Sequence, residues 1–126
     1  MNPVTGLSLG RIVIGVGGLA DPNLVGKLFR LDVESNPQLP LMTRMFAARE
    51  IALGVVTLAT RGTGRRRVIA LGMAVDGADA YAGTSAVTSG SVPKSVGAGF
   101  VIPAALAIAA GAVGLATSGK TQTPTD

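Results

Sequence analysis

The fold prediction rests on the stretch LMTRMFAAREIALGVVTLAT, residues 41–60, which has the length and apolar character of a transmembrane helix. Inside it lie three charged residues, Arg44, Arg49 and Glu50. An ionisable side chain at bilayer depth costs about 2.5–3.5 kcal/mol on insertion scales, so it normally faces a bundle interior and meets a partner there. The stretch therefore predicts neighbouring helices that carry complementary charges.

Those complementary charges occur in two other apolar stretches. Arg11 lies in the first, and Asp76 and Asp79 lie in the one that follows residues 41–60. At about 1.5 Å of rise per residue, these positions lie roughly 12–18 Å from the predicted cytoplasmic helix ends, near the bilayer midplane. We call this set the charged cluster: Arg11, Arg49, Glu50, Asp76 and Asp79.

The amino-acid composition supports a membrane protein and excludes several types of catalytic and metal-binding site. Of the 126 residues, 48% are hydrophobic and 14% are charged, against about 25% charged in ordinary soluble domains. The chain has no cysteine and no histidine, which excludes thiolate nucleophiles, Cys/His zinc sites and histidine general bases. We therefore expect no catalytic residue, no enzyme activity, no metal site and no cofactor.

The apolar stretches, and the proline, glycine and polar residues between them, predict an all-α, four-transmembrane-helix bundle that forms one domain over residues 1–116. The spans are expected at residues 3–20, 41–60, 68–85 and 96–116, followed by a disordered polar tail at 117–126. Asn2 and Pro3 form a helix start, and so do Asp21 and Pro22. The connection at residues 21–40 is expected to hold a short interfacial helix or, alternatively, a loop docked over the bundle.

Basic residues indicate the orientation. Four of the eleven basic residues fall in a short turn predicted between the second and third spans: Arg61, Arg65, Arg66 and Arg67. Such a turn orients a membrane protein with both termini in the cytoplasm, so the net charge of +4 does not indicate nucleic-acid binding. The expected location is a bacterial cytoplasmic (inner) membrane, crossed several times, with the lipid bilayer as the first partner.

The first span raises three further hypotheses. Gly6 and Gly10 form a small-xxx-small pair that favours close helix packing. Cleavage of a signal peptide after Ala20 is an alternative to a retained helix, but no basic residue precedes the apolar core. The residues 15–20 match a dinucleotide-binding fingerprint, which Asp21-Pro22 and the missing βαβ pattern contradict.

The charged cluster has three interpretations. Asp76 and Asp79 share one helical face, so Arg49 is expected between them, with Glu50 paired to Arg11. The cluster then serves as a register lock, as a proton or substrate relay that uses an aspartate, or as a polar docking site for a ligand or a partner helix. Two residues are possible accessories: Arg44, which can snorkel, and Tyr81, an interfacial anchor or a donor to an aspartate.

The pattern resembles the small four-helix integral membrane proteins of unknown function found in actinobacteria and other bacteria, and more loosely the DoxX-type membrane proteins. The motifs that carry the resemblance are Gly10-Arg11, Phe46-Ala-Ala-Arg-Glu50 with Gly54, the basic turn, and Asp76-x-x-Asp79. The resemblance implies an α-helical inner-membrane protein without an established activity.

These features predict a non-catalytic membrane protein, either an accessory subunit bound to another membrane protein or a small homo-oligomer. The alternative is a small transporter or proton-coupled carrier that uses the intramembrane carboxylates.

Overall fold

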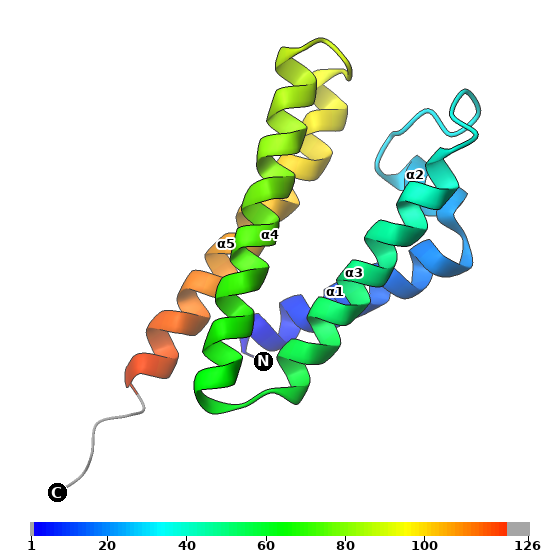
Figure 1. Cartoon of the computed structure of the whole chain (residues 1–126). Coiled ribbons are helices and arrows are strands. Elements are labelled where there is room, and N and C mark those ends of the chain that lie inside the picture. Colours follow the sequence, from blue (N-terminus) through cyan, green and yellow to red (C-terminus); the bar gives the residue numbers. More distant parts are fainter. Residues whose placement is uncertain (1, 121–126) are drawn as a thin grey trace, which may run out of the picture.

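The computed structural model describes residues 2–120, with side chains up to residue 118. This part of the chain forms five helices and no strand, which confirms the all-α prediction (Figure 1). The helices are α1 (Pro3–Ala20), α2 (Pro22–Leu28), α3 (Leu39–Ala59), α4 (Gly62–Thr88) and α5 (Lys94–Lys120).

The first two helices begin where local chemistry predicts. The Asn2 side chain accepts a hydrogen bond of 2.9 Å from the Val4 N–H, and Pro3 occupies the first turn of α1. Asp21 accepts a hydrogen bond of 3.1 Å from the Leu24 N–H at the start of α2. Each cap satisfies an N–H group that has no partner inside its helix. A short helix thus occupies the start of the connection at residues 21–40.

The turn between the second and third spans is shorter than the predicted residues 61–67. α4 begins at Gly62, so Arg65, Arg66 and Arg67 are helical. The chain reverses around Gly62, whose φ of 62° lies in the left-handed region that glycine adopts without steric penalty. Arginine is a good helix former, and this propensity carries α4 through the basic residues.

The other helix ends also extend past the predicted spans. α4 continues to Thr88 and α5 begins at Lys94, so the polar connection is shorter than predicted. α5 runs to Lys120, through the first residues of the predicted tail. The remainder of that tail, residues 121–126, lies outside the described residues.

α1 packs on α3 through glycines that remove side-chain bulk between the helices. A Cβ atom on Gly54 would lie 2.6 Å from the Ser8 carbonyl oxygen, and one on Gly15 would lie 2.7 Å from the Ala47 carbonyl oxygen. Both contacts are with backbone, so the two helices touch directly at these positions. The close approach predicted at Gly10 is wrong, because a Cβ there would have no neighbour within 4 Å.

The helices form two hairpins, α1 with α3 and α4 with α5. Contacts within each hairpin are extensive and contacts between the hairpins are few. The hairpins meet at the end that carries the α3–α4 turn and spread apart toward the other end (Figure 1). The start of α1 and the end of α5 lie at the same end as the α3–α4 turn.

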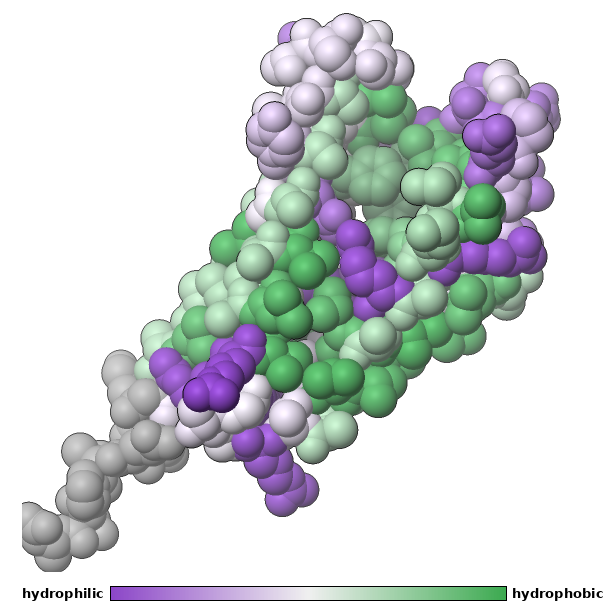
Figure 2. Space-filling view, in the orientation of Figure 1, coloured by the Kyte–Doolittle hydropathy of each residue, from purple (hydrophilic) through white to green (hydrophobic). Residues whose placement is uncertain are grey.

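Polar and small apolar side chains share the interior, and large apolar side chains lie on the outside. The buried side chains include six polar or charged residues, and the largest fully buried one is Ser8. Large apolar side chains lie on the outside, such as Val13 at 72% exposure and Leu106 at 66%. Figure 2 shows hydrophobic residues over much of the middle of the molecule, with one hydrophilic patch between the hairpins, and hydrophilic residues at the ends.

Two helices of the described chain are long and apolar enough to cross a membrane. They are α1 and the segment Lys94–Ser118 of α5. α3 and α4 have 21 and 27 residues, but α3 carries Arg44, Arg49 and Glu50, and α4 carries Asp76, Asp79 and three arginines. These charges lower the apolar character of α3 and α4 and leave their length unchanged.

Candidate functional site

The five residues of the charged cluster form one continuous series of ion pairs. Arg11 on α1 pairs with two carboxylates: its Nη1 lies 2.8 Å from Glu50 Oε2 and its Nη2 lies 2.5 Å from Asp76 Oδ2. Arg49 Nη2 lies 2.6 Å from Asp79 Oδ2 and 3.4 Å from Glu50 Oε1. The order along the series is Asp76, Arg11, Glu50, Arg49 and Asp79.

This pairing differs in part from the expected one. Glu50 pairs with Arg11 as expected, but Arg49 does not lie between the two aspartates, because Asp76 is taken by Arg11. Arg49 instead binds Asp79 in a bidentate manner, with Nη1 also 3.1 Å from Oδ1. The parallel fork geometry of guanidinium and carboxylate makes this a strong, directional pair.

Burial divides the series into an inner and an outer part. The side chains of Arg11, Glu50 and Asp76 are 9%, 6% and 4% exposed, whereas those of Arg49 and Asp79 are 36% and 29% exposed. The inner three side chains are therefore shielded from the surroundings, whereas the outer two are partly exposed. The Nε atom of Arg49 is buried and has no hydrogen-bond partner among the described residues.

The series connects the two hairpins. Arg11, Arg49 and Glu50 belong to the α1–α3 hairpin, and Asp76 and Asp79 belong to α4. Within the charged cluster, the formal charges sum to +1 on the first hairpin and −2 on the second, so their attraction acts across an interface that has few other contacts. Removing one member would leave a buried charge without its partner, which is far more costly than never burying it.

An aromatic cluster lies beside the outer part of the series. The three phenylalanines of the chain come together: the Phe29 ring stacks on Phe100 at a centroid distance of 4.8 Å and meets Phe46 edge-on at 6.4 Å. The Arg49 guanidinium lies 5.0 Å from the centroid of Phe46. The aromatic cluster thus joins α3 to α5 and covers one side of Arg49.

Sequence reasoning missed the aromatic cluster. Phe29, Phe46 and Phe100 lie far apart in the chain and share no motif. The only clue in the sequence was how few aromatic residues it has. In a chain with three phenylalanines and no tryptophan, the phenylalanines are candidates for one shared contact.

A central cavity of about 220 Å³ is lined by both the aromatic cluster and the carboxylates. Its lining includes Glu50, Asp76 and Asp79 together with Phe29, Phe100 and Pro103. A second cavity of about 290 Å³ continues between the hairpins past Asp79 and Phe46. Figure 2 shows the face of the molecule hollowed between the hairpins, with a hydrophilic patch below the hollow.

The accessory residues lie outside the charged cluster. Arg44 Nε donates to the Leu19 carbonyl at 3.4 Å, at the end of α1, where a cation meets the negative end of the helix dipole. Tyr81 is 76% exposed on α4 and makes no hydrogen bond to either aspartate in the described structure. Its outward position favours the interfacial-anchor interpretation over donation to an aspartate.

Arg61 lies in the α3–α4 turn, and Arg65, Arg66 and Arg67 follow it at the start of α4. The Arg66 side chain binds α5: its Nη1 donates to the Leu115 carbonyl at 2.8 Å and to Ser118 Oγ at 2.6 Å. It therefore fastens the start of α4 to the end of α5.

The chemistry that the charged cluster supports is electrostatic. Each of its three carboxylates accepts at least one hydrogen bond from an arginine. Among the described residues, no group of three His, Cys, Asp or Glu side chains is placed to hold a metal ion. The arrangement can hold helices together, and through Asp79 and Arg49 it can present charge to the space between the hairpins.

Comparisons of the chain with protein-family models, with curated proteins and with solved structures find no match.

Proposed function

We propose that the chain is a multi-pass protein of a bacterial cytoplasmic membrane, with α1, α3, α4 and α5 crossing the bilayer and both termini in the cytoplasm. At about 1.5 Å per residue, helices of 18 to 27 residues reach 27 Å or more, enough for a hydrocarbon core of about 30 Å with small adjustments. The arginine-rich α3–α4 turn lies at the same end as the start of α1 and the end of α5, which supports the cytoplasmic orientation.

The exposed large apolar side chains support lipid as the surrounding medium. Exposed valine, leucine and methionine side chains on the outer faces would be unfavourable in water and suit acyl chains. The charged-cluster residues of α3 and α4 pair with each other and with Arg11 of α1. In this arrangement α3 and α4 cross the membrane as parts of a bundle, although neither is apolar enough to do so alone.

Within that membrane, the protein acts as a non-catalytic component, an accessory subunit of a larger complex or a small homo-oligomer. The observation that carries this function is the continuous series of ion pairs across α1, α3 and α4, whose inner members are almost fully shielded. Groups held in this way specify which helices meet, which is the register-lock interpretation. The similarity to small four-helix actinobacterial proteins and to DoxX-type proteins remains a prediction within this proposal.

Native mass spectrometry of the full chain, taken from its own membrane in lipid-preserving particles, tests this function. A second protein retained in fixed ratio supports the accessory subunit, and a defined homo-oligomer supports self-association. A monomer at every protein concentration contradicts both. Extraction of membranes with alkaline carbonate is the control for placement, since release into the supernatant contradicts the membrane-spanning topology.

A transporter or proton-coupled carrier is the second candidate, and the central cavity favours it. Asp79 lines that cavity and is 29% exposed, so a proton or a solute can reach it from the space between the hairpins. In proteoliposomes, Asp79→Asn should leave protein abundance intact and abolish a pH-dependent flux. Wild-type vesicles as impermeable as empty ones, over a range of imposed pH gradients, would exclude this candidate.

A further inference from the structure

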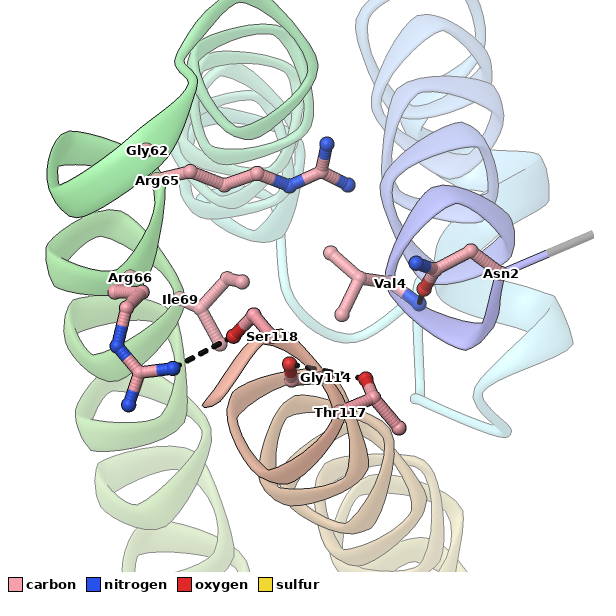
Figure 3. A pocket seen from close by; sticks show the side chains of 9 residues that line it. All are labelled: Asn2, Val4, Gly62, Arg65, Arg66, Ile69, Gly114, Thr117 and Ser118. Atoms are coloured by element: carbon pink, nitrogen blue, oxygen red, sulfur yellow. Dashed lines mark hydrogen bonds between the residues drawn. The ribbon is translucent and has the colours of Figure 1, made fainter. Parts of the chain in front are cut away.

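A separate cavity lies at the proposed cytoplasmic end, away from the charged cluster. It has a volume of about 430 Å³, within the usual range for small-molecule sites, and is formed where the start of α1, the start of α4 and the end of α5 meet (Figure 3). Its lining combines two arginines, Arg65 and Arg66, with apolar surface from Val4 and Ile69. None of its described lining residues is acidic.

The two arginines of this basic cavity differ in what they bind. Figure 3 shows Arg66 turned toward Ser118, consistent with its hydrogen bonds to α5. Arg65 extends from α4 across the space toward α1, and its guanidinium makes no hydrogen bond or ion pair with any described residue. Arg65 is a half-buried residue whose guanidinium has no partner among the described residues, and the described lining of the cavity has no carboxylate, so this guanidinium is placed to bind an anion.

We propose that the basic cavity binds the phosphate group of an anionic phospholipid, with Arg65 as the principal contact. This inference rests on the proposed membrane placement, because the cavity then lies at the level of the cytoplasmic headgroups. Arg65 and Arg66 supply charge in the cavity, and the buried side chains of Val4 and Ile69 form an apolar part of its lining. Basic pockets between transmembrane helices on the cytoplasmic side suit anionic headgroups in this way.

The amphipathic lining favours a lipid over free phosphate. A soluble phosphate needs only donors, whereas this cavity places buried Val4 and Ile69 beside the arginines. The uncapped start of α4 adds to the positive potential, since the Arg61 side chain makes no capping hydrogen bond there. The guanidinium of Arg65 can form a bidentate pair with phosphate oxygens, which a lysine could not do.

The test measures lipid binding to the delipidated full chain in detergent by native mass spectrometry. The probes are phosphatidylglycerol, phosphatidylcholine with the same acyl chains, glycerol phosphate and inorganic phosphate. We expect phosphatidylglycerol to bind with the highest affinity, and Arg65→Gln to weaken that binding about tenfold, the loss typical of one charge-assisted contact. Arg67→Gln is the matched control, because it removes the same charge from an exposed neighbour that does not line the cavity.

The possible results separate the explanations. Equal losses for Arg65→Gln and Arg67→Gln would mean diffuse electrostatic attraction and would overturn the site. Equal binding of phosphatidylcholine would overturn the requirement for an anionic lipid, and glycerol phosphate binding as tightly as the lipid would overturn the lipid source. Arg65→Lys, which keeps the charge, should lose affinity less than Arg65→Gln. Carbonate extraction of the same variants reports separately on membrane placement.

Discussion

Arg11 and Asp76 form the buried contact that joins the two hairpins, with Nη2 of Arg11 2.5 Å from Oδ2 of Asp76. Arg11 also holds Glu50 of its own hairpin, so one guanidinium satisfies carboxylates from both sides of the interface. The stability of the assembled fold is therefore more sensitive to Arg11 than to the more exposed Arg49.

Replacement of Arg11 by leucine should lower the free energy of unfolding by about 3–5 kcal/mol, because Asp76 remains buried without its partner and Glu50 keeps only its longer contact with Arg49. Arg49→Leu should cost less, since Arg49 and Asp79 are each about a third exposed. Titration with SDS, followed by circular dichroism, compares the two variants. Equal losses would contradict the inner and outer division of the charged cluster.

The double variant Arg11→Leu/Asp76→Leu should be more stable than the sum of the single effects allows. Removal of both partners leaves no orphaned charge in this pair, while Glu50 keeps its contact with Arg49. A double-mutant cycle in the same SDS titration measures the coupling free energy. Additive effects would show that Arg11 and Asp76 do not interact.

The glycine contact between α1 and α3 leads to a steric prediction. Gly54→Ala should destabilise the protein by about 1–3 kcal/mol, because the new Cβ would press on the Ser8 carbonyl and force α1 away from α3. Gly10→Ala is the control, since open space surrounds that position and alanine is the better helix former by about 0.5–1 kcal/mol. A stabilising Gly54→Ala would contradict the packing of this hairpin.

Arg30 follows α2 with a φ of 60°, a conformation that costs a non-glycine residue about 1–2 kcal/mol. Its N–H donates to the Lys27 carbonyl and the Leu31 N–H donates to the Gly26 carbonyl, so this is the left-handed position of a helix-ending motif. Arg30→Gly should therefore raise thermal stability. Lys27→Gly, inside α2, should lower it, and a lower stability for both would contradict the assignment.

A pH prediction concerns Asp32 in the α2–α3 connection. The Ser35 hydroxyl and the Ser35 N–H both donate to its carboxylate and lower the pKa of Asp32. A lowered folded-state pKa adds stability above the unfolded pKa, and that contribution is lost as the pH falls through the folded value. Ser35→Ala should raise the pKa of Asp32 toward its ordinary value, as measured by NMR titration of the side-chain carboxyl. An unchanged pKa would show that the hydroxyl contact does not persist in solution.

Helix starts were the most predictable part of the fold, because they depend on neighbouring residues. Asn2-Pro3 and Asp21-Pro22 each supply a side-chain acceptor followed by a proline, and both begin helices as expected. The predicted start of α4 was wrong for a related reason. The glycines and arginines at residues 61–67 resembled a loop, but the single Gly62 was enough to turn the chain.

The sequence predicted which residues form the charged cluster, but only part of which residue pairs with which. Buried charges in apolar segments need partners, which brings Arg11, Glu50 and Asp76 to attention without any structure. Which guanidinium meets which carboxylate depends on helix rotation and crossing, and these are set by contacts such as Gly54 on Ser8. The aromatic cluster depends on tertiary contacts alone, so no periodicity in the sequence indicates it.

The division of the charged cluster between hairpins also affects biosynthesis. In the proposed topology, Arg11 and Glu50 can pair as soon as α3 has entered the membrane, but Arg49 must await Asp79, which is 30 residues further along the chain. At about 5–20 residues per second, the ribosome needs about 2–6 s to deliver it. During that interval the newly made α3 carries an unmatched cation, so its stable insertion depends on the arrival of α4.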